Sequence, residues 1–256
     1  MDEGRFVGKV ALVTGAAGGM GRAIAAAFAD AGARVVVSDV SAEAGEETVA
    51  GIRESGGEAT FIPADVADAD AVECLVARTV AAFGGLHCAV NAAAIELERV
   101  PLADVDDAVF DKIIAVNLRS IFLCMKHEIR QFLAQGTGGV IVNIGSTNSQ
   151  RPQPHQSAYT ASKYGVLGMT RNAAIDYAGV GIRINAILPG AIDTPMLRAA
   201  IERRGREPQE VADRLSLLGR FGSTDEIAKA ALWLCSEDSS FTVGHALAVD
   251  GGYLVR

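Results

Sequence analysis

The fold of this chain is decided by the stretch Lys9-Val10-Ala11-Leu12-Val13-Thr14-Gly15-Ala16-Ala17-Gly18-Gly19-Met20-Gly21. It begins with an apolar run typical of a short buried strand, and the residues that follow, 22–30, favour a helix. Glycines between strand and helix let the backbone approach a ligand closely, and the first helical turn directs unpaired N–H groups towards it. The stretch therefore predicts a turn that binds a dinucleotide pyrophosphate, with a simple tight turn as the alternative.

An acidic residue, Asp39, ends the next apolar run, 34–39. Its carboxylate is placed to accept hydrogen bonds from an adenosine ribose, and a 2′-phosphate there would cost on the order of a few kcal/mol in repulsion. The adjacent loop positions Gly18, Val40 and Ser41 carry no cation to offset this charge. Asp39 therefore predicts NAD rather than NADP, unless it only helps to cap the helix that begins after Ser41.

A second motif consists of Tyr159 and Lys163, whose spacing places a phenol and an ammonium on one face of a helix. Ionising a tyrosine near neutrality requires its pKa to fall by about 3 units, or roughly 4 kcal/mol. A cation at ~4 Å supplies about that much at an effective dielectric of ~20. Ser146 follows the apolar run 140–144, so a strand end and this helix face can converge. The set predicts an acid–base site, although the pair alone is also common on the wet face of a helix.

These features occur together with several others, and the chain resembles the short-chain dehydrogenase/reductase family of the shorter, single-domain type. The resemblance covers nearly the whole length. It is carried by Thr14-Gly15-x-x-x-Gly19-x-Gly21, Asp65-Val66, Asn91, Asn117, Ser146, Tyr159-x-x-x-Lys163, Pro189-Gly190 with Thr194, and Asp250-Gly251-Gly252.

The resemblance implies a catalytic role for four residues. Tyr159 would exchange a proton with the substrate oxygen, and Ser146 would hydrogen-bond the same oxygen. Lys163 would bind the nicotinamide ribose and lower the pKa of Tyr159. Asn117 would hold a water that links Lys163 to solvent, with a satisfied amide on a helix surface as the alternative.

The resemblance also implies a cofactor site along the same edge of the fold. Asp65 and Val66 would border the adenine, and Asn91 would lie beside the cofactor ribose. Ile192 and Thr194 would contact the nicotinamide amide. The residues expected to bind NAD are Gly15, Gly19, Met20, Gly21, Asp39, Asp65, Val66, Asn91, Tyr159, Lys163, Pro189, Gly190, Ile192 and Thr194.

The chain departs from the family at Asn91-Ala92-Ala93-Ala94, where Asn-Asn-Ala-Gly is usual. The missing amide removes an internal hydrogen bond worth on the order of 1 kcal/mol, and Ala94 adds a methyl group where close approach is expected. We expect altered stability and a less tightly held cofactor ribose, without loss of chemistry.

Apolar β-branched runs alternate with helical stretches along the chain. Strands are predicted near 10–14, 34–39, 59–63, 86–91, 139–144, 182–187 and 246–250. The alternation predicts an α/β fold, a Rossmann-type doubly wound sheet of about seven parallel strands flanked by helices, in one NAD-binding domain over residues 1–256. Helix ends are predicted at Gly32, at Ser41 and at a capping box, Ser223-x-x-Glu226.

Composition excludes several function classes. The formal net charge is −8 without a run of Lys or Arg, which argues against nucleic acid and anionic membranes as partners. The chain has neither a basic-then-apolar leader nor an apolar stretch of ~18 residues, so a cytoplasmic protein is expected. Four cysteines and four histidines occur without metal-ligand spacing, which favours buried reduced thiols and no catalytic metal.

We therefore expect an NAD-dependent dehydrogenase of a small secondary alcohol, with cyclic and polyhydroxylated compounds as candidates. One alternative is a 3-oxoacyl-thioester reductase, which Asp39 disfavours because fatty-acid synthesis usually draws on NADPH. Another is a non-catalytic nucleotide-sensing protein.

Three longer segments bear on assembly and substrate. The helices around 106–135 and 157–178 carry apolar faces that predict a homotetramer, unless both faces are used within one subunit. The segment 148–156 is polar and could bind a hydroxylated or acidic substrate, although an exposed loop is favoured. In the segment 196–219 arginines and acids nearly cancel, and a mobile lid is expected.

Overall fold

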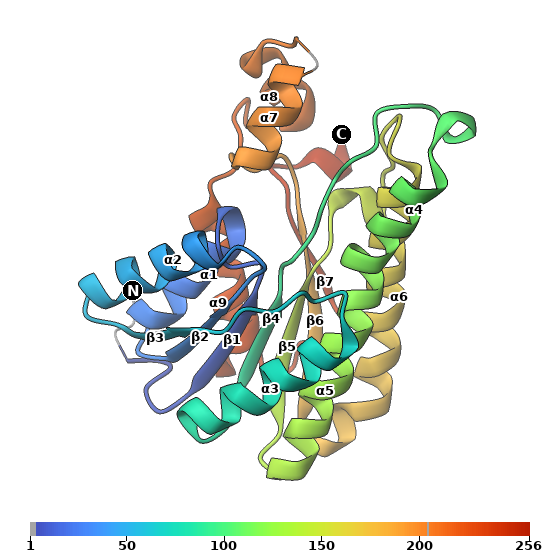
Figure 1. Ribbon diagram of the computed structural model, residues 1–256. Helices are drawn as coiled ribbons and strands as arrows, with labels where there is room; N and C mark the ends of the chain where they lie inside the picture. Colours follow the sequence, from blue (N-terminus) through green and yellow to red (C-terminus); the bar gives the residue numbers. More distant parts are fainter. Residues whose placement is uncertain (1–3, 204) are drawn as a thin grey trace.

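Seven parallel strands form one sheet in the computed structural model, which describes residues 4–203 and 205–256. Their order across the sheet is β3-β2-β1-β4-β5-β6-β7 (Figure 1). The strands are β1 (Val10–Thr14), β2 (Arg34–Ser38), β3 (Glu58–Phe61), β4 (Cys88–Asn91), β5 (Gly139–Ile144), β6 (Ile182–Pro189) and β7 (Ala246–Val249). The predicted doubly wound sheet is confirmed, and the strand ends differ from the prediction by at most two residues.

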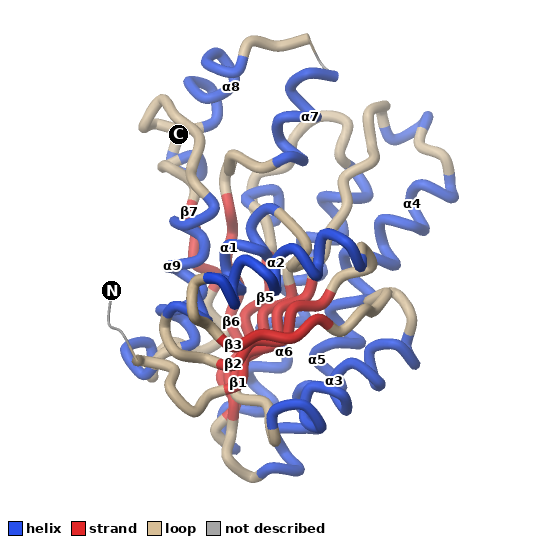
Figure 2. The backbone as a smooth tube through the Cα atoms, turned by 60° about the vertical axis from the view of Figure 1, so that its left-hand side comes forward, coloured by secondary structure: helices blue, strands red, loops and turns tan. Residues whose placement is uncertain are grey.

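Helices cover both faces of this sheet (Figure 2). They are α1 (Gly19–Asp30), α2 (Ala42–Glu54), α3 (Ala69–Phe83), α4 (Asp107–Ile114), α5 (Ser120–Gln135), α6 (Ser157–Tyr177), α7 (Pro195–Arg203), α8 (Pro208–Leu215) and α9 (Thr224–Cys235). One core cluster joins the sheet to α1, α2 and α9, and a second joins it to α3, α5 and α6. Because both faces are covered, all five residues of central strand β1 are buried.

Local signals placed the helix ends where the sequence predicted. Gly32 follows the end of α1 and has a φ of 91°, a backbone conformation that glycine adopts without strain. Ser41 is the N-cap of α2, although its hydroxyl makes no capping bond. The capping box of α9 is complete, because Ser223 and Glu226 each bond to the other's backbone N–H.

The predicted helix over 106–135 is interrupted in a way the sequence did not show. A π-helical turn, Ala115–Arg119, separates α4 from α5 and contains Asn117. Such turns widen the helix locally and are frequent at functional sites.

The loops that follow the strands at their carboxyl ends gather at one edge of the sheet, and α7 and α8 stand beyond that edge (Figure 1). Ligands of doubly wound sheets bind at this edge. None of the helices in the described ranges is long and apolar enough to cross a membrane.

Candidate active site

The glycine turn after β1 is shaped so closely that two of its glycines have no room for a side chain. A Cβ on Gly15 would lie 2.6 Å from the backbone nitrogen of Ala93, and a Cβ on Gly21 would clash with the Gly15 carbonyl. Gly15 also has a φ of 66°. The turn therefore packs against the loop after β4 and brings the N-terminus of α1 to the surface of the edge, as a pyrophosphate site requires.

The same turn faces the loop that follows β6. A Cβ on Gly19 would lie 3.6 Å from the Thr194 methyl carbon. Pro189 ends β6, and a Cβ on Gly190 would lie 2.7 Å from the Asp250 Cα, so this loop is also tightly packed. Three segments predicted to bind the cofactor are thus brought together: the glycine turn, the loop after β4 and the loop after β6.

Asp39 lies at the rim of the glycine turn. One carboxylate oxygen accepts a hydrogen bond from Ala17 N at 3.0 Å, and the other accepts one from Ser41 N at 3.1 Å. Asp39 therefore fixes both the glycine turn and the segment that leads into α2, and its role in ribose binding stays a prediction. Lone pairs remain on both oxygens for ribose hydroxyls.

A cation that sequence reasoning missed lies near this rim. The Arg22 guanidinium donates to the carbonyl oxygens of Ala17 at 2.6 Å and Ala44 at 3.2 Å, and it lies 3.4 Å from Glu47. The sequence feature that could have revealed it is the position of Arg22 in the first turn of α1, from which its side chain folds back over the glycine turn.

Val66 and Asp65 follow β3 at the same edge. Val66 is buried in a small cluster that includes Ala93, the residue against which Gly15 packs. Asp65 is exposed, and its carboxylate accepts a bond from Ala67 N at 2.9 Å. Both positions agree with an adenine border, which stays a prediction.

Tyr159 lies in the first turn of α6, and Ser146 lies directly after β5. Burial raises the pKa of Tyr159 to about 12, and the nearby Glu96 carboxylate also raises it, whereas Ser146 lowers it. The phenol is therefore protonated at neutral pH in the protein alone.

Lys163 lies one turn further along α6 and is almost fully buried. Its Nζ donates to the carbonyl oxygen of Ile144 at 2.9 Å and lies 5.8 Å from the centre of the Tyr159 ring. Burial lowers the pKa of Lys163 to about 8. In the protein alone, burial decides the Tyr159 pKa and the ammonium is directed at a carbonyl, so the lowering of the Tyr159 pKa by Lys163 stays a prediction for the cofactor-bound site.

Asn117 is fully buried in the π turn. Its amide nitrogen donates to the carbonyl of Ile95 at 2.8 Å, and its amide oxygen accepts from Ile95 N at 2.8 Å. The alternative, a satisfied amide on the helix surface, is wrong about the position, because Asn117 is buried. It is right that the amide has hydrogen-bond partners. Because the side chain is committed to Ile95, its role in holding a water stays a prediction.

Asn91 turns its side chain into the core instead of towards the edge of the sheet. Its amide nitrogen donates to Glu128 Oε2 and to Asn143 Oδ1, each at 3.1 Å. The side chain is therefore engaged in the core, and the predicted place of Asn91 beside the cofactor ribose stays a prediction.

Glu128 is a fully buried carboxyl group that sequence reasoning missed. Burial raises its pKa to about 7, against a lowering by the Asn91 bond. Within the described residues, Glu128 Oε1 and Asn91 Oδ1 have no hydrogen-bond partner. The spacing in the sequence could have revealed it. Glu128 lies three residues after Met125 and four before Phe132, which places it on the buried apolar face of α5.

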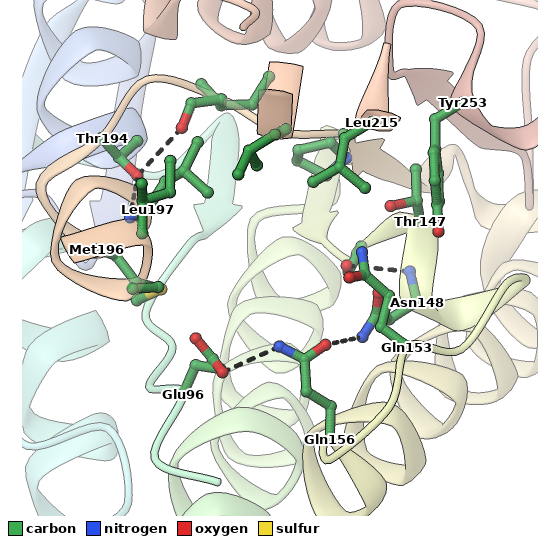
Figure 3. Close-up of a pocket in the computed structure, with 18 of the residues that line it drawn as sticks. Glu96, Thr147, Asn148, Gln153, Gln156, Thr194, Met196, Leu197, Leu215 and Tyr253 are labelled. Carbon is green, nitrogen blue, oxygen red and sulfur yellow. Dashed lines mark hydrogen bonds between the residues drawn. The ribbon is translucent and has the colours of Figure 1, made fainter. Parts of the chain in front are cut away.

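Tyr159 and Ser146 line a cavity. Figure 3 shows its walls, with Glu96, Gln156 and Leu215 among the labelled residues. Predicted residues that line it are Met20, Ser146, Tyr159, Pro189, Gly190, Ile192 and Thr194. The polar side contains a chain of hydrogen bonds in which Asn148 donates to Gln156 at 2.6 Å and Gln156 donates to Glu96 at 2.9 Å. The segment 148–156 is therefore not simply an exposed loop, because three of its residues, Asn148, Gln153 and Gln156, form a wall of the cavity.

The opposite side of the cavity is largely apolar and comes from α7, α8 and the C-terminal segment. It includes Leu197, Ala200, Ile201, Val211, Leu215 and Tyr253. The arrangement places one hydroxyl and one phenol, with a buried ammonium behind the phenol ring, beside a cavity that a small molecule with an apolar body can enter. In residues 4–203 and 205–256, no group of three or more His, Cys, Asp or Glu side chains could hold a metal ion.

Comparison with known proteins agrees with this geometry. A family model described as enoyl-(acyl carrier protein) reductase matches residues 15–254. The chain is 42% identical to a short chain dehydrogenase/reductase of Aspergillus oryzae, over 96% of this chain and 94% of that protein. It is 43% identical to 2,5-dichloro-2,5-cyclohexadiene-1,4-diol dehydrogenase of Sphingobium indicum, over 96% and 97% of the two chains.

A solved structure leads to the same conclusion. The crystal structure of levodione reductase superposes with a TM-score of 0.94 at 36% identity, over 98% of this chain and 99% of that one. The glycine turn, the Ser146–Tyr159–Lys163 set and these matches along almost the whole sequence agree, and the chain belongs to the short-chain dehydrogenase/reductase family of oxidoreductases, which use a nicotinamide cofactor.

Proposed function

We propose that this protein is an NAD-dependent dehydrogenase that interconverts a cyclic secondary alcohol and its ketone. The observation that carries the proposal is the placement of Tyr159 and Ser146 on one cavity with Lys163 buried behind them. Relatives named for a cyclohexadiene diol and for levodione support a ring-shaped substrate.

The roles of the side chains follow from their environments. Tyr159, protonated in the protein alone, is ready to donate a proton to a ketone oxygen, and it must become a phenolate to accept the proton of an alcohol. Ser146 would hold the same oxygen. The chemistry supplied by a bound nicotinamide is hydride exchange and, when oxidised, a positive charge beside these groups. Lys163 adds its own charge from behind the Tyr159 ring.

The choice of NAD over NADP rests on Asp39. Its carboxylate lies at the rim of the glycine turn with lone pairs free for ribose hydroxyls, and a 2′-phosphate would meet like charge. Arg22 is the nearby cation that could favour NADP, but its guanidinium is bonded to two carbonyl oxygens. We therefore propose that Asp39 decides the preference.

The experiment that tests the function is NADH formation by the purified protein with NAD or NADP. The panel contains cyclic alcohols and diols, acyclic polyols and 3-hydroxyacyl thioesters. We expect activity with NAD on cyclic alcohols. Activity confined to thioesters would favour the acyl reductase, which the description of the matching family model keeps as a second candidate. NAD binding without turnover of any compound would favour a nucleotide sensor.

We also propose a cytoplasmic homotetramer built from one NAD-binding domain per chain. Large apolar side chains are exposed on α5 and α6, where a partner subunit would cover them. They are Phe122, Leu133, Tyr164 and Ile175, of which Ile175 is 80% exposed. Light scattering after gel filtration would measure the mass of the assembly, and a monomer would refute this part of the proposal.

A further inference from the structure

The α7–α8 segment separates charges that cancel in the sequence. Arg206 and Arg214 line the cavity beside Tyr159. The acidic residues of the same segment do not line it; they are Glu202, Glu207, Glu210 and Asp213. The segment therefore turns positive charge, but no negative charge, towards the substrate.

In the part of the chain that the structure describes, these two arginines are also without counter-ions. Elsewhere around the segment, Arg198 is paired with Asp193 at 2.6 Å and Arg220 with Glu226 at 2.8 Å. Within residues 4–203 and 205–256, neither Arg206 nor Arg214 has a side-chain hydrogen bond or an ion pair. Both arginines are exposed, and an arginine that lines a cavity without an ion-pair partner can pair with an anionic ligand.

Among the described residues that line the cavity, Glu96 is the one acid, and it is already engaged in hydrogen bonds. Glu96 accepts hydrogen bonds from Arg99 at 2.6 Å and from Gln156 at 2.9 Å. Figure 3 shows Glu96 and Gln156 on one side of the cavity, with Leu197 and Leu215 across from them. The α7–α8 segment thus contributes both apolar side chains, such as Leu197 and Leu215, and the two arginines that can attract an anion.

We propose that the substrate carries a carboxylate on an apolar ring, at a position remote from the reacting hydroxyl, and that Arg206 and Arg214 attract this carboxylate. The inference rests on the proposed function and names its substrate class. In a chain of net charge −8, a local pair of free cations also gives an anion a preferred direction of approach.

The test compares 4-hydroxycyclohexanecarboxylate with the neutral 4-hydroxycyclohexanecarboxamide. Because a hydrogen bond from arginine to a carboxylate is charge-assisted, we expect the acid to have a kcat/KM ~10-fold higher, decreasing with added salt. Arg206→Gln and Arg214→Gln should each raise KM for the acid by a larger factor than KM for the amide. Arg203→Gln is the matched control, because Arg203 belongs to α7 but does not line the cavity.

Equal activity with acid and amide would overturn the carboxylate proposal and leave the dehydrogenase assignment intact. A fall in kcat/KM by the same factor for acid and amide in both arginine variants would also overturn the carboxylate proposal and leave the dehydrogenase assignment intact. Competition by cyclohexanecarboxylate gives a second measurement that needs no turnover of the probe itself. If the protein oxidises none of the neutral alcohols in the panel either, the dehydrogenase assignment itself is refuted, and the carboxylate proposal that rests on it is refuted too.

A second inference comes from an independent observation at the start of α6. Glu98, which is 1% exposed, accepts hydrogen bonds from the Ser157 hydroxyl at 2.6 Å, from Ala158 N at 2.9 Å and from Tyr159 N at 2.7 Å. First-turn N–H groups have no partner within a helix, and the N-cap residue Gln156 makes no capping bond here. A carboxylate from about sixty residues earlier caps this helix instead.

We infer that Glu98 is a positioning residue for Tyr159. It does not line the cavity, so it acts through the backbone of the residue that does. Its bonds are charge-assisted and lie at the positive end of the helix, both of which strengthen them. A misplacement of about 1 Å at a reacting group can cost ~100-fold in rate, so loss of this cap should reach the chemistry.

Glu98→Ala should lower kcat about 10- to 100-fold while KM for NAD changes little, and Glu98→Gln should retain more of the rate because an acceptor remains. Asp68→Ala is the matched control, since Asp68 caps α3 through two backbone N–H groups. Both alanine variants should melt earlier, but only Glu98→Ala should lose turnover and shift the pH profile of kcat. An unchanged kcat in a folded Glu98→Ala protein would reduce Glu98 to a structural cap.

Discussion

Replacing Glu128 with glutamine tests the buried polar cluster between α5 and the sheet. The carboxyl group is fully buried, and Asn91 donates to one of its oxygens at 3.1 Å. Glutamine keeps the shape and an acceptor for Asn91 Nδ2, and it removes the titration. The variant therefore isolates the cost of a buried charge.

The direction of the pH dependence follows from the raised pKa. Burial raises the pKa of Glu128 from 4.5 to about 7, so between these values the folded chain holds a proton that the unfolded chain has lost. Stability from this group is complete below pH 4.5 and is lost as the pH rises through 7. The full loss is about 3 kcal/mol.

Urea unfolding of wild type and Glu128→Gln at pH 5 and pH 8.5 measures this difference. We expect glutamine to gain about 2–3 kcal/mol relative to wild type between the two pH values. Glu54→Gln, on the exposed end of α2, is the control and should show no such change. If the difference between wild type and Glu128→Gln is the same at both pH values, Glu128 does not titrate in this range and the reasoning fails.

Three further predictions concern the cofactor and the chemistry. Tyr159→Phe should lower kcat by ~100- to 10,000-fold and leave NAD binding, measured by fluorescence titration, intact; normal turnover would remove Tyr159 from the mechanism. Asp39→Ala should reduce the ratio of kcat/KM for NAD over NADP at least ~10-fold, and an unchanged ratio would refute its assignment. Gly15→Ala should destabilise the protein by about 1 kcal/mol or more and raise KM for NAD, because its Cβ would lie 2.6 Å from Ala93 N; a variant that melts and binds NAD like wild type would show that the two loops can separate without cost.

Much of the fold could be predicted because its signals are local. Alternating apolar runs and helical stretches identified seven strands, and the Ser223 capping box depends on residues only three apart. The glycine turn is similar, since strand, turn and helix follow each other directly in the chain. Short-range sterics and hydrogen bonds decide such features, so the order of residue types along the chain is sufficient to predict them.

The parts that only the tertiary structure decided depend on which residues meet across long separations. The side chain of Asn91 points to the core because β4 pairs with β5 in the register that sets it opposite Asn143. Tyr159 has a raised rather than a lowered pKa because burial, a property of the whole fold, outweighs its neighbours.

The same reason explains the residues that sequence reasoning missed. Glu98 meets the start of α6 about sixty residues later, and Arg206 and Arg214 face the cavity while the acids beside them in sequence do not. The sequence by itself determined the family and the sheet, and it predicted the reacting set. Which charges are buried, paired or directed at the substrate was decided by packing, because burial and orientation arise only when distant segments close around one another.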